Sequence, residues 1–242
     1  MQLPLNAKLV VSHGSAARLN AAAEWLNAYS PDAEILVLSA TKEAGDEFVR
    51  NAALSSGARF GLSRFTLNHL AASLAAPELA RAGLVPASNL ALTAVSARSI
   101  HLLNRAGALT YFGPVADKPG FPTAVARSLE ELRMNRADPR AISMLRRGGP
   151  DLAALAESVA GELAEAKIAD RARTFEAAIP VAQNSAATGP LGLPLLMLDI
   201  QLTSSLEADL VAALAGRAPA VFATLPRGDE RDRKSTRLNS SH

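Results

Sequence analysis

Gly14 and Ser15 follow the apolar run "KLVVS" after one residue, at the position where a phosphate-binding loop would join a strand to a helix. Such a loop has the pattern G-x-x-x-x-G-K-[ST], because its glycines let backbone N–H groups surround the phosphates while its lysine neutralises them. Here neither the second glycine nor the lysine follows Gly14. We therefore expect an ordinary strand-to-helix turn in preference to a working nucleotide loop.

Asp199 ends the apolar run "LLMLD", a pattern typical of the strand whose aspartate holds Mg²⁺ in ATPases. The pattern is short, and an aspartate after a strand more often begins a turn or caps a helix. Active ATPases of this type place a glutamate next, to polarise the attacking water. Ile200 and Gln201 follow here, which argues against hydrolysis.

Other reaction chemistries find little support. His13, His69 and His101 share no metal-ligand spacing, and the chain has no cysteine, so we expect no metal site. The hydrolase pattern G-x-S-x-G is absent, and we assign no catalytic residue. Arg146 and Arg147 precede "GGP" and have the charge to contact phosphate, but we expect a solvated loop there.

The elements that position Gly14 and Asp199 form a parallel α/β pattern. Apolar runs predict strands at 8–12 and 34–40, and an amphipathic helix follows each of them. We expect Thr41 to cap the second helix. A short strand at 59–62 and a helix capped by Thr66 come next. Alternating strands and helices indicate a parallel sheet, whose ligands bind at the carboxyl ends of its strands.

Helical periodicity dominates the middle of the chain. No convincing strand is visible from 76 to 178, and Pro122 and Asp151 are expected to begin helices. Strands return at 195–200 and 218–226. We therefore predict an α/β fold interrupted by an all-α insertion, divided as follows: 1–75, first half of the α/β domain; 76–190, inserted helical subdomain; 191–231, second half; 232–242, a tail.

The tail "DRKSTRLNSSH" matches, codon by codon, a standard sequencing adapter read in one frame. We interpret 232–242 as artefactual and expect the chain to be the N-terminal piece of a longer protein. Removing three basic residues and one acidic residue from totals of 25 and 23 leaves 22 of each. The net charge of +2 therefore comes from the tail and carries no information about nucleic acid.

Composition places the chain among globular proteins. Hydrophobic residues make up 49% of it, and no apolar run is long enough to cross a bilayer, so we expect no membrane partner. The first residues lack the charged and apolar regions of a secretory signal. Together with the absence of cysteine, this favours the cytoplasm.

Several segments, taken in order, resemble superfamily 1 DNA helicases. "ILVLSATKEAGDEFVRNAAL" and "FGLSRFTLNHLAASLA" resemble the two motifs in which a strand, a threonine and a helix contact single-stranded DNA, and "LLMLDI" stands where the Mg²⁺-binding strand belongs. With "YFGPVADKPGFPTAVARSLEELR" and "AVFATLPRGDE", the chain is similar to the N-terminal part of large PD-(D/E)XK nuclease family proteins and of AddB-type helicase–nuclease subunits.

This resemblance implies a P-loop NTPase-like domain of the helicase 1A type, in a parent protein that processes DNA ends for recombinational repair. It implies DNA as the ligand, a helicase–nuclease partner subunit, and ATP and Mg²⁺ for the parent, with no cofactor in this chain. Carried over, the DNA-backbone contacts are Thr41 and Thr66, with Lys42 and Arg64 beside them. Gly14, Ser15 and Asp199 become positions of a vestigial nucleotide site.

Two alternatives stay open at this point. One is an active ATPase or helicase that uses an unorthodox phosphate loop. The other is an unrelated nucleotide- or metabolite-binding α/β enzyme whose helical insertion forms a lid. The missing Gly-Lys-Thr and the missing glutamate favour a DNA-holding scaffold over a motor.

Overall fold

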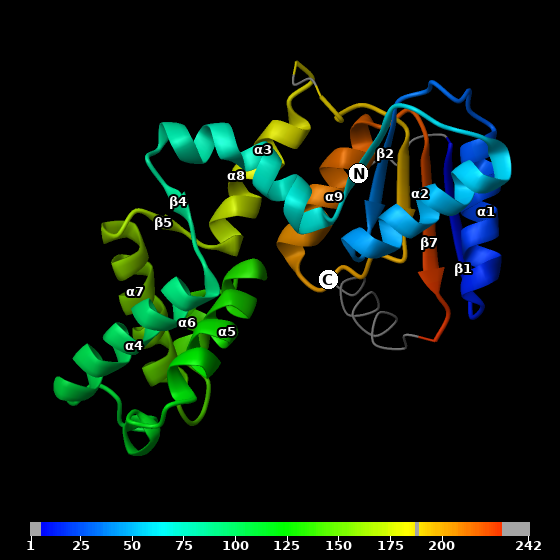
Figure 1. Ribbon diagram of the computed structural model, residues 1–242. Coiled ribbons are helices and arrows are strands. Elements are labelled where there is room, and N and C mark those ends of the chain that lie inside the picture. The colour runs from blue at the N-terminus through cyan, green and yellow to red at the C-terminus, as the bar shows by residue number, and fades with distance from the viewer. Residues whose placement is uncertain (1–5, 187–188, 229–242) are drawn as a thin grey trace. The chain divides into compact units, whose positions relative to one another are not determined.

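A computed structural model describes residues 6–186 and 189–228, and it divides the chain into two compact units (Figure 1). Unit 1 comprises Met1–Leu70, Ala182–Leu202 and Val211–His242. Unit 2 comprises Ala71–Val181 and Thr203–Leu210. The predicted artefactual tail, 232–242, lies outside the described residues.

Unit 1 is built on a five-stranded sheet in which every neighbouring pair is parallel. The α/β class with a parallel sheet is therefore confirmed. In spatial order the strands are β1 (Ala7–Ser12), β7 (Val221–Pro226), β6 (Leu195–Leu198), β2 (Ile35–Ser39) and β3 (Leu62–Phe65). The central strands β2 and β6 are almost entirely apolar, as expected for strands that are buried on both faces.

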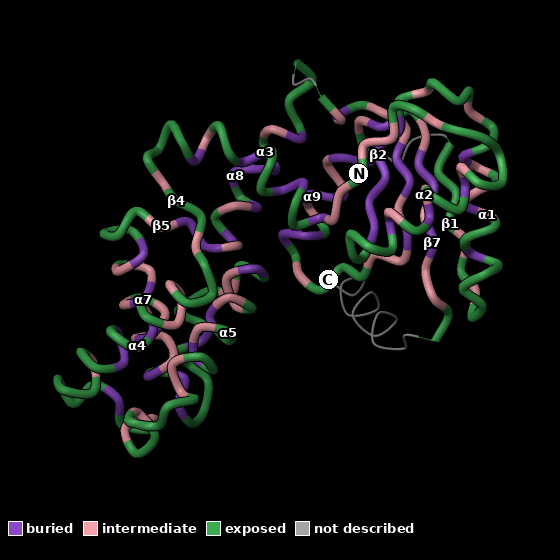
Figure 2. The backbone as a smooth tube through the Cα atoms, viewed as in Figure 1, coloured by how far each residue is buried: buried purple, intermediate pink, exposed green. Residues whose placement is uncertain are grey.

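Helices α1 (Ser15–Asn27) and α2 (Lys42–Ser56) cover one face of this sheet, and the buried strands lie at its centre (Figures 1 and 2). Their inward side chains pack with those of the strands in one cluster: Ala22, Leu26, Ile35, Val37, Phe48, Ala52, Leu196, Leu198 and Phe222. The apolar side of each helix thus packs on the sheet, and this packing sets the position of the helix N-terminus relative to the strand ends.

Strand β1 is the edge strand beside β7, and its side chains alternate in environment. Val10 packs against the core cluster, and the Lys8 ammonium lies 5.7 Å from the ring centroid of Phe222. Leu9 and Val11 point to the other face and are 58% and 50% exposed.

Unit 2 is mainly helical. Its elements, three of which cross into unit 1, are α3 (Leu67–Arg81), β4 (Val85–Pro86), α4 (Asn89–Arg105), η1 (Gly113–Val115), α5 (Phe121–Met134), α6 (Pro139–Ser143), α7 (Gly149–Glu165), β5 (Ile168–Ala169), α8 (Arg171–Gln183) and α9 (Ser205–Arg217). Its core joins α4, α5 and α7 through Ile100, Leu109, Val125, Leu129, Leu155, Val159 and Leu163. Pro122 lies in the first turn of α5, as predicted.

The expectation of no strand between 76 and 178 is wrong, because β4 and β5 form a short parallel pair. Val85 lies opposite Ile168, and each strand has only two residues. A two-residue strand has no periodicity that a sequence window could detect.

The predicted strand at 59–62 is also wrong, since β3 occupies Leu62–Phe65. The residues before it pack on the preceding turn: the Arg59 guanidinium donates to the carbonyl of Tyr29 at 3.2 Å, and the amide of Phe60 donates to the carbonyl of Pro31 at 2.9 Å. Gly61 then adopts φ 84°, outside the φ range of regular β-strands.

Asp151 does not cap α7, contrary to prediction. Gly148 occupies the cap position and Asp151 lies inside the first turn, where it is 2% exposed. Its carboxylate instead accepts hydrogen bonds from the amides of Tyr111 and Phe112, at 2.8 and 2.9 Å, and from the Thr110 hydroxyl at 3.2 Å.

Candidate functional site

The carboxyl ends of the five parallel strands meet at one edge of unit 1, and all seven predicted site residues lie on or beside that edge. β1 leads into Gly14 and Ser15, and Asp199 directly follows β6. Thr41 follows β2 after one residue, and Thr66 directly follows β3. This edge is the usual position for ligands in open α/β sheets.

Asp199 forms a bidentate ion pair with Arg18, a residue of the first turns of α1. The Arg18 Nε atom lies 2.9 Å from Oδ1 and the Nη2 atom lies 2.8 Å from Oδ2. The remaining Nη1 atom donates to the carbonyl oxygen of Ser12 at 2.5 Å. The Arg18 side chain is 6% exposed, whereas that of Asp199 is 30% exposed. The guanidinium therefore links the carboxyl end of β1 to the carboxyl end of β6.

Thr224, on the intervening strand β7, completes the coordination of Asp199. Its hydroxyl donates to Oδ1 of Asp199 at 2.7 Å and accepts from the Asp199 amide at 3.0 Å. Asp199 itself has φ 50°, which few residues other than glycine, asparagine and aspartate adopt. Both carboxylate oxygens thus already receive donors from the protein.

The balance of these contacts keeps Asp199 ionised. Burial alone raises the pKa of the Asp199 carboxyl, but hydrogen bonds from Arg18 and Thr224 and the positive charge of Arg18 lower that pKa by more. The hydrogen bond and charge of Asp199 correspondingly raise the pKa of Arg18 against the opposing effect of burial. A charged pair of this kind needs no external cation.

The backbone amide and carbonyl of Gly14 are likewise hydrogen-bonded within the protein. Gly14 has an extended conformation, φ −79° and ψ 122°, and a methyl group added there would meet nothing within 4 Å. Its amide donates to the Ser12 hydroxyl at 3.3 Å, and its carbonyl accepts from the Arg18 amide at 3.4 Å. The turn therefore lacks the left-handed glycines whose converging amides surround a phosphate.

Thr41 and Thr66 lie at the ends of neighbouring strands and cap the helices that follow, as predicted. The Thr41 hydroxyl accepts from the Ala44 amide at 3.2 Å, and the Thr66 hydroxyl accepts from the His69 amide at 3.3 Å. β2 and β3 are paired over four residues, so the N-termini of α2 and α3 both begin at this edge. Each hydroxyl keeps a hydrogen that can be donated to an anion.

Two cations accompany these caps. Lys42 is the first residue of α2, is exposed, and makes no ion pair within the described part of the chain. Arg64, on β3, pairs with Asp46 at 2.8 Å, and both side chains are about half exposed, at 46% and 45%. An exposed pair of this kind contributes little to stability, so a phosphate can replace Asp46 at small cost.

Arg18 and Thr224 are the functional positions that the sequence reasoning missed. Arg18 follows Gly14 by four residues and is the sole charged residue in the first two turns of α1. The signal available in the sequence is a lone arginine at the start of an alanine-rich helix, close to a strand end. Its partner lies 181 residues away, so the sequence could not identify the pair.

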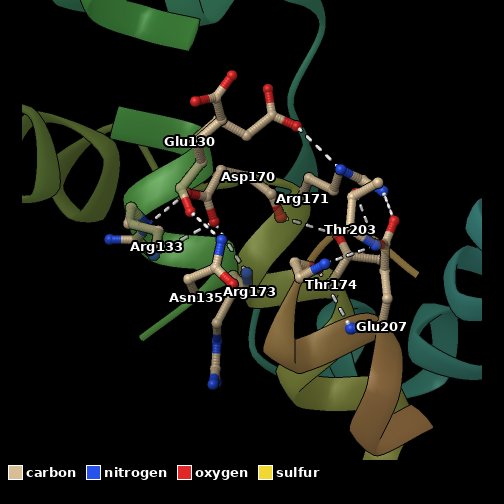
Figure 3. A network of polar contacts seen from close by, with 11 residues as sticks. Glu130, Arg133, Asn135, Asp170, Arg171, Arg173, Thr174, Thr203 and Glu207 are labelled. Atoms are coloured by element: carbon tan, nitrogen blue, oxygen red, sulfur yellow. Dashed lines mark hydrogen bonds and ion pairs between the residues drawn. The ribbon is translucent and has the colours of Figure 1, made fainter. Parts of the chain in front are cut away.

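Unit 2 contains a second polar cluster, shown in Figure 3, whose charges compensate one another. Arg171 lies 2.5 Å from Glu207 and 3.9 Å from Glu130, and Arg133 lies 2.5 Å from Asp170. Glu207 and Asp170 also accept backbone amides at the starts of α9 and α8: Thr203 and Ser204 donate to Glu207, and Arg173 donates to Asp170. The cluster therefore holds the starts of α8 and α9 in place.

An apolar hollow of about 730 Å³ lies between α5, α6 and α7 of unit 2. Its lining is mostly small and apolar, and Arg133, Arg140 and Glu157 are its charged members.

Within residues 6–186 and 189–228, no three histidine, aspartate or glutamate side chains gather as a metal would require. Nor is any helix of that described chain both long and apolar enough to cross a bilayer. No protein-family model and no curated protein matches the sequence.

Proposed function

We propose that this chain is a helicase-like, DNA-binding portion of an ATP-dependent helicase–exonuclease-type protein that acts in double-strand-break repair by recombination. We further propose that its nucleotide site is degenerate. The observation that carries the proposal is the Arg18–Asp199 pair, which puts a guanidinium where a nucleotide-bound Mg²⁺ would need the carboxylate.

The strand arrangement supports the helicase-like, P-loop type of sheet. β7 lies between β1 and β6, so the turn after β1 and the aspartate after β6 face each other across a single strand. Arg18 reaches across that strand to Asp199. In an active site of this type, phosphate and Mg²⁺ occupy this space. Here the protein fills it with its own charges.

DNA binding is supported by the neighbouring half of the same edge. Helix N-termini attract phosphate through their free amides and partial positive charge. Thr41 and Thr66 mark two such termini on adjacent strands, and Lys42 and Arg64 add positive charge beside them. Two anion-binding positions in a row suit a nucleic acid backbone better than a single small ligand.

Adding Mg²⁺ and ATP should leave the melting temperature of the protein unchanged, because Asp199 has no oxygen free of a donor. A site filled at about 100 times its Kd stabilises a protein by about 2.7 kcal/mol, which is several degrees for a chain of this size. Differential scanning fluorimetry with ATP, ADP and Mg²⁺ alone measures this. A clear rise with Mg²⁺-ATP would favour the active ATPase alternative.

Replacing Lys42 and Arg64 together by alanine should weaken single-stranded DNA binding by about tenfold per lost charged contact. The slope of log K against log salt should fall by about 0.7 for each. Fluorescence anisotropy of a labelled oligonucleotide across a salt series measures both quantities.

Arg50→Ala is the matched control, since Arg50 lies on the same helix, pairs with Glu47 and is about two-thirds exposed. It removes one positive charge, against two in the double variant, at a distance from the sheet edge. An equal loss of affinity for each charge removed in Arg50→Ala and in the double variant would reduce the effect to overall charge. A metabolite-binding enzyme, the remaining alternative, predicts no steep salt dependence.

The parent protein is proposed to use ATP and Mg²⁺, to pair with a helicase–nuclease partner subunit, and to act in the cytoplasm. Its nuclease chemistry is assigned to residues other than those of this chain. For this chain itself the role is to hold DNA without hydrolysing nucleotide.

A further inference from the structure

Tyr111 is an exposed aromatic ring held on a rigid base in unit 2. It lies in the segment between α4 and η1 and is 52% exposed. The Phe112 ring packs against it in a T-shaped arrangement, with centroids 5.1 Å apart. Gly148 lies close behind: a methyl group added there would come within 2.7 Å of the Tyr111 ring. The ring is thus supported on its inner side and open on its outer side.

The backbone of this segment is fixed by Asp151. Its buried carboxylate accepts the amides of both Tyr111 and Phe112, and also the Thr110 hydroxyl. Burial raises the pKa of Asp151, but these hydrogen bonds lower it by more, so the group remains a carboxylate. Tyr111 therefore needs little ordering when a ligand arrives.

Three exposed arginines belong to the segments that carry the ring and its supporting glycine. Arg146 and Arg147 directly precede Gly148, and both are exposed. Arg105 is also exposed and stands next to Asn104, which lies near Gly113. Across the described residues these three arginines form no ion pair. Asp117, which pairs with Lys118 at 3.4 Å, is the exposed acid in the two segments 104–118 and 144–148.

Arg147 also has φ 54°, in the left-handed region that costs an ordinary residue free energy. Gly148 follows with φ 62°. This pair of conformations places the glycine backbone against Tyr111 and leaves the arginine side chain outside the core. The strained residue thus directly precedes the glycine that supports the exposed ring.

We propose that Tyr111, with Arg105, Arg146 and Arg147, binds single-stranded nucleic acid, the ring stacking on a base and the arginines contacting phosphates. A base offers a flat apolar face that duplex DNA conceals, and stacking on an aromatic side chain works for any base. Interleaved aromatic and cationic side chains are the combination that such ligands require. This surface lies in unit 2 and does not depend on the sheet edge proposed above.

The test uses the whole chain and a labelled oligothymidylate of about 15 nucleotides, within the site sizes of proteins of this kind. Tyr111→Ala should weaken binding by about 5- to 100-fold, the range for loss of one stacked base. Tyr111→Phe keeps the ring and should bind within about twofold of the wild type. Phe60→Ala is the matched control, because Phe60 is 73% exposed in unit 1.

Arg147→Gly provides a variant that folds at least as well, since glycine adopts positive φ freely. It should weaken binding and lower the salt slope by about 0.7. An abasic strand of equal length should bind more weakly, and Tyr111→Ala should not weaken it further.

Unchanged binding in Tyr111→Ala and Arg147→Gly would overturn the proposal, as would tighter binding of duplex than of single strands. Equal losses on the abasic strand would exclude stacking. If changes of Lys42 and Arg64 weaken binding while changes of Tyr111 and Arg147 do not, the proposal for the Tyr111 surface is rejected and the sheet-edge proposal is supported. If Tyr111 and Arg147 matter while Lys42 and Arg64 do not, the sheet-edge interface is rejected and the Tyr111 surface is supported. If the protein binds no nucleic acid strand, both proposals are rejected.

Discussion

Replacing Asp199 by alanine is expected to lower the free energy of unfolding by about 3 kcal/mol. The cost arises because Arg18, with a side chain only 6% exposed, would keep its charge but lose its partner. Thr224 would also lose the acceptor of its hydroxyl. Urea denaturation followed by circular dichroism measures the change from the transition midpoint and slope.

Two controls isolate the buried pair. Asp46→Ala removes the partner of Arg64 in a half-exposed pair and should cost less than about 1 kcal/mol. Arg18→Met combined with Asp199→Asn should cost less than the two single changes added together, because no unpaired charge remains buried. A loss in Asp199→Ala no larger than in Asp46→Ala would show that the pair contributes little.

Asp151→Ala is expected to cost about 3 kcal/mol, since it leaves the amides of Tyr111 and Phe112 without acceptors in a buried place. Asp151→Asn should cost clearly less, because the single carbonyl oxygen of asparagine can accept both amides. Denaturant titration of the three proteins gives this ranking. Equal costs in the two variants would mean that charge, not hydrogen bonding to the amides, stabilises the loop.

The same carboxyl gives the second prediction a pH signature. The pKa of Asp151 in the folded protein lies below its usual value of 3.8, so folding favours the ionised form. Its stabilisation is complete well above pH 3.8 and is lost as the pH falls through the lower folded value. The difference in stability between the wild type and Asp151→Asn should therefore shrink in acid and stay constant from about pH 6 to 8. Asp138→Asn, an exposed cap residue, is the control.

Much of unit 1 could be predicted from the sequence because its signals are local. Apolar runs marked β2, β6 and β7 closely, and the threonine caps were confirmed by hydrogen bonds to residues three positions ahead. The predicted position of β3 was wrong because Arg59 and Phe60 donate hydrogen bonds to a turn about thirty residues earlier in the chain. A local sequence pattern does not reveal such contacts. The position of Asp199 at a strand end was a local feature too.

What the sequence could not provide was the partner of each buried charge. Arg18 meets Asp199 only because β1 and β6 are separated by one strand in the folded sheet. Asp151 is a residue type that often caps helices, yet it accepts hydrogen bonds from a loop about forty residues earlier in the chain. Pairing of this kind depends on topology, and a single sequence does not encode it in any local pattern.

The Arg18–Asp199 pair also restricts how this protein can change over evolutionary time. Freeing Asp199 to bind a cation would require loss of Arg18, and loss of Arg18 alone leaves a partly buried carboxylate without its partner. Loss of Asp199 first would instead leave the buried guanidinium of Arg18 without its partner. A single-substitution path to a cation site at Asp199 therefore passes through a less stable protein. Once both residues are present, each restricts substitution of the other, whereas exposed positions can change without leaving a buried charge unpaired.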